Sequence, residues 1–197
     1  DKGANNAFNG VFMNCKKLTA IEIPDRAIYI GTSAFSSCTA LATVTINETS
    51  NLQRFGKAAF SGCTSLRSIY IPKTVSNTAF VNEQTAQEYA IGSDAFANSA
   101  ISTVTFALGG TGDLSIASGA FAGSMITSIS LPKRVAPIYT SSYGNWATYD
   151  GIAINCFDSG LNAKITDINI EEGGTYYGSQ DGVLYRVKDG VLNEMMY

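Results

Sequence analysis

Residues 30–47 read IGTSAFSSCTALATVTIN, and residues 55–72 read FGKAAFSGCTSLRSIYIP. Both stretches hold, at matching positions, an apolar residue followed by glycine, an Ala-Phe pair, a cysteine, a leucine and an alternating apolar end. The second copy begins about 25 residues after the first, and self-similarity at such a period is the signature of a repeat protein. The chain is therefore expected to stack similar coils on one another.

The same phrase occurs six times along the chain, each time around one anchor phenylalanine. A small residue or a thiol precedes nearly every anchor, and an apolar residue stands five positions before it. The anchors are Phe12, Phe35, Phe60, Phe96, Phe121 and Phe157. Two of the intervals between anchors are longer than the others and hold insertions, near residues 73–90 and 133–151.

Each phrase closes with a segment in which apolar and polar residues alternate: AIEI, TVTI, SIYI, TVTF, SISL and DINI. Alternation of period two indicates a half-buried strand. The strands recur once per coil in one direction, so they predict a parallel sheet. Because the spacing changes around each Ala-Phe pair, we expect short helical turns on the opposite face. Residues 1–170 are thus predicted to form a right-handed α/β-type solenoid of about six coils.

The C-terminal segment, residues 171–197, departs from the repeat. Asp189-Gly190 lies between alternating apolar residues, which is a strong hairpin signal. We expect a hairpin that turns at Lys188-Asp189-Gly190 and caps the solenoid as part of the same domain.

Composition limits the kinds of partner. The chain has 13 Lys and Arg, 16 Asp and Glu and a net charge of −3, and the basic residues form no cluster. A surface that follows nucleic-acid phosphates is therefore not expected. No apolar run approaches the ~18 residues that span a membrane. No secretion signal or anchor is recognised in this chain.

The residues needed for common catalytic sites are missing. The sequence contains no histidine, which removes the usual Ser-His-Asp and Cys-His arrangements. Residues 107–115 are glycine-rich but lack the spacing of a phosphate-binding loop. Glu171 and Glu172 adjoin a predicted strand and should point in opposite directions, so they would not flank one glycosidic bond. We expect no catalytic residues, no metal site and no cofactor.

The cysteines show no CxxC pair. Cys15, Cys38 and Cys63 share one repeat position and should stack in one column. A buried column of reduced thiols is the simpler interpretation, and a disulfide between adjacent coils is the alternative. Cys156 stands at another repeat position and is expected in a different column.

The phrase IG..AF..C..L..I.IP resembles the BspA-like leucine-rich repeats of bacterial surface proteins, over about residues 7–170. The C-terminal DGVLY segment is similar to hairpins found near such arrays. Coils four and five depart from the pattern with Ser99 and Ser124 in place of cysteine. The resemblance implies a secreted or cell-surface protein with a role in adhesion or protein binding, and it carries no catalytic residues.

Two surfaces are candidates for ligand binding. The outward strand positions form a small, neutral, polar face, on which Tyr70 is the large contact residue; this face is either a ligand platform or a plain solvated surface. The second insertion holds Tyr139, Tyr143, Trp146 and Tyr149 among Ser, Gly and Asn, a composition like that of a paratope. These aromatic side chains either contact a ligand or pack against one another as a small hydrophobic core within a long loop.

The leading hypothesis is a secreted or cell-surface binding module, whose ligand is a protein or a glycan of a host or microbial surface. A structural spacer within a longer surface protein and a polysaccharide-active enzyme are the alternatives. An enzyme would need carboxylates or basic groups converging in a groove, and the sequence shows none. The sequence does not indicate an oligomeric state.

Overall fold

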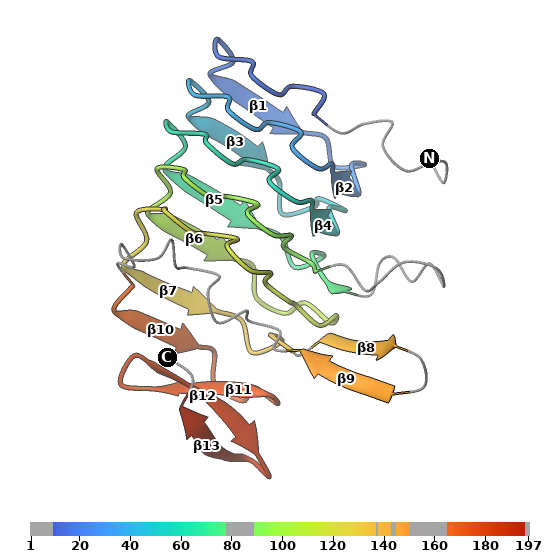
Figure 1. Ribbon diagram of the computed structural model, residues 1–197, viewed down its shortest axis with the longest axis vertical. Helices are drawn as coiled ribbons and strands as arrows, with labels where there is room; N and C mark the ends of the chain where they lie inside the picture. The colour runs from blue at the N-terminus through green and yellow to red at the C-terminus, as the bar shows by residue number, and fades with distance from the viewer. Residues whose placement is uncertain (1–9, 78–88, 137, 143–144, 150–164, 196–197) are drawn as a thin grey trace.

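A computed structural model describes residues 10–77, 89–136, 138–142, 145–149 and 165–195, with the backbone alone for 138–142, 145–149 and 193–194. Six short strands follow one another down one side of the molecule (Figure 1). They coincide with the six alternating segments of the sequence. These strands are β1 (Ala20–Ile23), β3 (Thr43–Ile46), β5 (Ser68–Ile71), β6 (Thr103–Phe106), β7 (Ser128–Leu131) and β10 (Asp167–Ile170).

The predicted single parallel sheet is divided into three parallel pairs, β1–β3, β5–β6 and β7–β10. Strands β3 and β5 are neighbours, as are β6 and β7, but no ladder joins them. Hydrogen bonds on the turn side connect the coils at these junctions, as from Phe35 N to Ala59 O at 2.8 Å and from Phe96 N to Ala120 O at 2.7 Å. The coils therefore stack continuously although the sheet does not. The right-handed sense of the coil stays a prediction.

A second column of parallel pairing runs along the coils at the apolar residue five positions before each anchor. It begins with β2 (Tyr29–Ile30) and β4 (Arg54–Phe55) and continues through bridges from Phe55 to Ile91 and from Ile91 to Ile116. The backbones approach closely here, because a Cβ on Gly92 would lie 2.8 Å from the carbonyl carbon of Gly56. Glycine after the apolar residue thus allows the coils to stack.

The predicted helical turns are wrong: the described residues contain no α-helix. The return path consists of successive tight turns, in which the residues two before and two after each described anchor, from Phe12 to Phe121, have left-handed backbone conformations. At the Phe96 turn these are Asp94 (φ 56°) and Asn98 (φ 54°). Alternate amides donate to the next coil, as from Asn98 N to Ala122 O at 2.7 Å. Because these amides are bonded between coils, they are unavailable for the i→i−4 bonds of a helix.

The anchor phenylalanines form a continuous stack through the core. Ring centroids of successive anchors lie 5.0–5.6 Å apart from Phe12 to Phe121, with the ring planes within 10° of parallel. Phe12 is 39% exposed at one end of the stack, whereas Phe60, Phe96 and Phe121 are fully buried. Phe157 lies outside the described residues. The described anchors confirm that the repeated phrase builds one core.

The cysteine column is only partly buried. Cys38 and Cys63 are buried, whereas Cys15 is partly exposed, so the prediction is wrong for Cys15, which lies in the first described coil. All three thiols are free, and Cys38 Sγ donates to Phe12 O at 2.9 Å while Cys63 Sγ donates to Phe35 O at 3.2 Å. Burial is the main cause that raises the pKa of Cys63 to about 12, and it also raises the pKa of Cys38. Cys156 lies outside the described residues.

Alkylation by iodoacetamide at pH 8 should therefore rank the three thiols. Cys15 should react fastest and Cys63 slowest, because the thiolate is the reactive form and burial both excludes the reagent and raises the pKa. Peptide mass spectrometry would give the extent of labelling at each site, and labelling in denaturant provides the unfolded control. Native labelling of Cys63 at the rate of Cys15 would contradict the stacked column.

The C-terminal segment forms a three-stranded antiparallel sheet of β11 (Tyr177–Gln180), β12 (Val183–Lys188) and β13 (Val191–Met195). The predicted turn is confirmed, with Asp189 and Gly190 at φ 54° and 77°. A second hairpin turns at Asp181-Gly182, which carries the same sequence signal but was not predicted. Ile168 N donates to Gly182 O at 2.8 Å, which joins this sheet to the last described coil. The boundary at residue 170 stays a prediction.

The second insertion is not simply a loop. It contains an antiparallel hairpin of β8 (Ile138–Ser142) and β9 (Asn145–Tyr149), which lies beside the solenoid (Figure 1). Residues 78–88 of the first insertion lie outside the described part. Within the part that the structure describes, no helix has the length and apolar character needed to cross a membrane.

Candidate ligand-binding surface

The outward strand positions form two rows across the coils. In-register pairing aligns Thr43 with Ala20 and Thr45 with Glu22, and the same alignment recurs in the other two pairs. Most of these side chains are exposed, as the alternating sequence predicts, while Tyr70 and Asp167 are partly buried. The rows are Ala20, Thr43, Ser68, Thr103, Ser128 and Asp167, and Glu22, Thr45, Tyr70, Thr105, Ser130 and Asn169.

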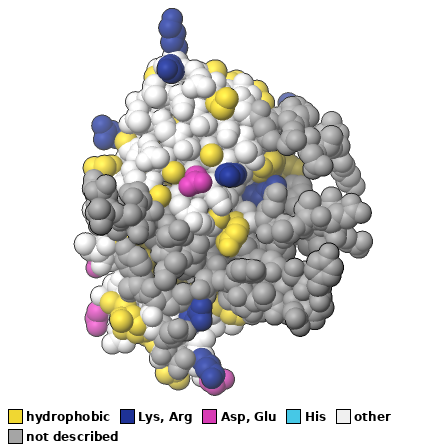
Figure 2. Space-filling model, in the orientation of Figure 1, with side chains coloured by type: hydrophobic (Ala, Val, Ile, Leu, Met, Phe, Trp, Pro, Cys, Tyr) yellow, Lys and Arg dark blue, Asp and Glu magenta, His cyan; other side chains and the backbone are white. Residues whose placement is uncertain are grey.

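Hydroxyl groups dominate this strand face. Ser and Thr hydroxyls can both donate and accept hydrogen bonds, so the face suits a ligand rich in hydroxyls or peptide groups. Figure 2 shows one side of the molecule on which Lys, Arg, Asp and Glu are scattered among uncharged side chains. The described part of that side carries no basic patch.

Tyr70 is the large side chain of the strand face. Its register partner is Thr105 on β6, and its ring packs partly against the core. Burial is the main cause that raises the pKa of the Tyr70 phenol, and the nearby charge of Glu48 raises it further. A tyrosine phenol is protonated at neutral pH, so Tyr70 presents a hydrogen-bond donor within the second row of the strand face.

The aromatic residues of the second insertion are only partly placed. Tyr139 lies on β8, opposite Thr148, while Trp146 lies on β9, opposite Ser141, and Tyr149 ends β9 opposite Ile138. Tyr143 lies outside the described residues. The hairpin thus brings the backbones of three predicted contact residues together, and their role in binding stays a prediction.

Two features near the candidate surface were missed by the sequence interpretation. The first is Arg134, whose Nη1 donates to Val75 O at 2.6 Å and to Gly112 O at 3.0 Å. Burial lowers the pKa of this guanidinium. It lies against Gly110, where a Cβ would come within 2.7 Å of Nε, so the glycine-rich stretch leaves room for an arginine. Arg134 therefore ties three coils together.

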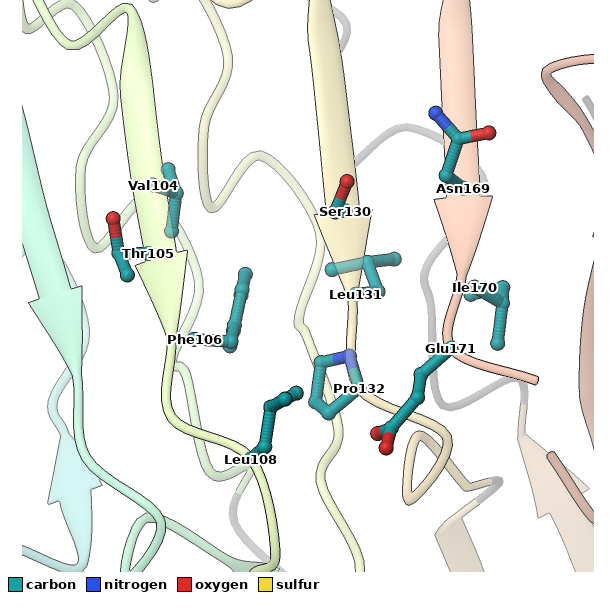
Figure 3. Close-up of a pocket in the computed structure, with 10 residues that line it drawn as sticks. All are labelled: Val104, Thr105, Phe106, Leu108, Ser130, Leu131, Pro132, Asn169, Ile170 and Glu171. Carbon is teal, nitrogen blue, oxygen red and sulfur yellow. The ribbon is translucent and has the colours of Figure 1, made fainter. Parts of the chain in front are cut away.

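The second is a groove of about 350 Å³ at the carboxyl ends of β6, β7 and β10 (Figure 3). It lies where no ladder joins β6 to β7. Apolar side chains make up most of its wall, and Glu171 stands on the β10 side. The lining residues are Val104, Thr105, Phe106, Leu108, Ser130, Leu131, Pro132, Asn169, Ile170 and Glu171.

The acidic residues show no catalytic arrangement in the described part. Glu171 Oε2 accepts a hydrogen bond from Lys133 N at 3.2 Å. The next residue, Glu172, is exposed. Asp25 accepts hydrogen bonds from Asn47 and Thr49, which lower the pKa of its carboxyl group. Among the described residues, no group of three or more Cys, Asp or Glu side chains is placed to hold a metal ion.

Three solved structures are similar to this chain, and the first of them supports the repeat fold. The pneumococcal vaccine antigen PcpA matches with a TM-score of 0.62 and 24% identity, over 85% of this chain and 34% of the antigen. A leucine rich cell surface protein from Faecalibacterium prausnitzii matches with a TM-score of 0.48 and 22% identity, over 92% of this chain and 46% of that protein. A leucine-rich repeat protein from Bacteroides ovatus matches with a TM-score of 0.38 and 16% identity, over 84% of this chain and 52% of that protein. This chain thus spans about a third to a half of these proteins.

No curated protein matches the chain significantly. The profile of one family, described as the BspA type leucine rich repeat region, matches residues 5–107 and 84–180 in six copies. The matched residues cover most of the sequence, and six is also the number of anchor phenylalanines. This chain therefore belongs to the BspA type leucine rich repeat family.

Proposed function

We propose that this chain is a binding module of a secreted or cell-surface protein and that its ligand is a protein or a glycan. The observation that carries the proposal is the strand face, whose two rows consist mostly of exposed Ser and Thr side chains. The phenylalanine stack and the turn-side hydrogen bonds build the core and join the coils, so these rows are free to vary with the ligand. Repeat proteins commonly bind ligands on such extended faces.

The family and the likeness to PcpA support this proposal. The sequence motif resembles repeats of bacterial surface proteins, and one similar solved structure is that of a pneumococcal vaccine antigen. The second insertion supplies aromatic residues, which are enriched where binding energy concentrates. In the proposed arrangement the strand face provides polar contacts and the β8–β9 hairpin provides large aromatic anchors.

The proposal is tested by probing glycan and host-protein arrays with the purified chain. The double variant Thr105→Lys and Ser130→Lys places two charges in the middle of the strand face and should remove the signal of a ligand bound there. Thr39→Lys is a control that adds one charge away from the strand face, because Thr39 is exposed on the connection between the turn and β3. Equal signals from both variants would exclude the strand face. The absence of any ligand would favour a structural spacer.

A further inference from the structure

Leu108 breaks a rule that the other coils follow. We name the second residue after each outer strand the rim position. Five coils place a charged residue there, whereas the coil of β6 places Leu108, whose side chain is 66% exposed. The charged rim residues are Asp25, Glu48, Lys73, Lys133 and Glu172. A large apolar side chain left in water at a position otherwise given to charge suggests a contact surface.

Leu108 also stands at the edge of the groove between β6 and β7. Figure 3 shows Leu108 and Pro132 approaching each other from the ends of β6 and β7. Phe106 and Leu131 form the wall behind them and are 8% and 2% exposed. The same coil thus carries Phe106 where four of the others have isoleucine. The two departures from the repeat lie together and shape one apolar hollow.

The groove has an acidic side. Glu171 follows β10, and its Oε2 accepts a hydrogen bond from the backbone of Lys133. Among the described residues, Glu171 Oε1 has no hydrogen-bond partner and the Glu171 carboxylate forms no ion pair. This carboxylate is therefore placed to accept a hydrogen bond from a cationic group of a ligand.

The shape of the groove defines its occupant. It crosses the ends of three strands, and two spacings of paired strands would already make about 10 Å, so the groove has room for about three residues of extended chain. Side chains two apart in an extended chain point to the same side, about 7 Å from each other. Among the described residues that line it, none presents an exposed aromatic ring, so this lining lacks the flat apolar surface on which sugar rings stack. These features favour a peptide over a glycan.

We propose that the Leu108 groove binds an extended segment of a protein partner, seating one aliphatic or aromatic side chain between β6 and β7. A Lys or Arg two residues along the segment reaches Glu171. The inference rests on the proposed binding function and deepens it, because it names a peptide with an apolar-x-basic pattern as the ligand.

A random peptide library displayed on phage provides the probe. It is selected on the wild-type chain and counter-selected on Leu108→Lys, which restores a charge at the rim position. Enriched peptides should carry the apolar-x-basic pattern. A synthetic copy of the dominant peptide, measured by fluorescence anisotropy, should bind Leu108→Lys about ten-fold more weakly than wild type. Glu171→Gln should weaken binding about two- to five-fold, as loss of an exposed ion pair would.

Glu48→Gln is the matched control, because it changes the charge by the same +1 at the rim position of another coil and should bind as wild type does. Selected peptides that lack the apolar-x-basic pattern, or that bind Leu108→Lys as tightly as wild type, would contradict the proposed peptide site in the groove. The proposed binding function of the chain would be unaffected. A selection that enriches no peptide would also contradict a peptide site in the groove. The glycan and host-protein arrays test the binding function separately. Circular dichroism confirms that each variant is folded.

Discussion

Replacing Phe60 by alanine is expected to lower the free energy of unfolding by about 3–5 kcal/mol. The Phe60 ring is fully buried and stacks between Phe35 at 5.0 Å and Phe96 at 5.6 Å, and it also contacts Phe55 at 6.3 Å. Its removal loses the transfer free energy of the ring and leaves a cavity in the middle of the stack. Such a loss is a large part of the ~5–15 kcal/mol that stabilises a typical domain.

Urea denaturation followed by circular dichroism would measure this effect as a shift of the midpoint. Phe12→Ala is the matched control, because Phe12 is 39% exposed and has one described stacking partner, Phe35. Phe12→Ala should lower the free energy of unfolding clearly less than Phe60→Ala does. Equal and small effects at both positions would mean that the phenylalanine stack is not the main source of stability.

The strands and the anchor stack could be predicted from sequence because each depends on a local pattern that recurs. The period-two alternation of Val44 and Ile46 appears again in every coil, and one strand per coil follows from it. The turn face could not be predicted in the same way. Ser33, Ala58 and Asp94 adopt left-handed conformations although none is glycine. Hydrogen bonds to the next coil stabilise these conformations, and those bonds exist only after the coils have stacked.

The division of the sheet likewise depends on geometry between coils. The sequences of β6 and β7 are as suited to pairing as those of β5 and β6, yet only the second pair forms a ladder. Arg134 gave no signal either, because its two carbonyl partners lie on other coils. Leu108 is different: comparing the six coils at the rim position, the second residue after each outer strand, reveals it as the apolar exception. The signal was present in the sequence, but only the structure places it beside a groove.

The candidate site is predicted less fully than the fold, since a repeat identifies what must be buried and leaves open what is recognised. Outward positions such as Thr105 and Ser130 follow from the alternation, and their exposure confirms that reading. The aromatic insertion was identified by composition alone. Its hairpin requires pairing between β8 and β9, from Ile138 with Tyr149 to Ser142 with Asn145. That pairing shows that the insertion has regular structure outside the repeat.

Trp146→Ala is expected to weaken ligand binding by about 2 kcal/mol or more, which is roughly thirty-fold in Kd, while leaving the denaturation midpoint nearly unchanged. Binding energy concentrates in large, rigid aromatic side chains, and this is the single tryptophan of the chain. The hairpin that contains it lies outside the repeated coils, so their stacking does not depend on it. Titration of the strongest array ligand onto wild type and variant measures the difference.

Tyr70→Ala separates the two candidate surfaces, because Tyr70 lies on the strand face and not on the hairpin. If the hairpin provides the anchor, Trp146→Ala should cost more affinity than Tyr70→Ala. The competing interpretation, a private core within the insertion, predicts the reverse pattern for Trp146: lost stability and a tryptophan shielded from solvent. Acrylamide quenching of the free protein distinguishes them before any ligand is known, since strong quenching is expected of a contact residue. Weak quenching would move the binding site to Tyr70 and the strand face, where the Ser and Thr rows would then have to supply the affinity.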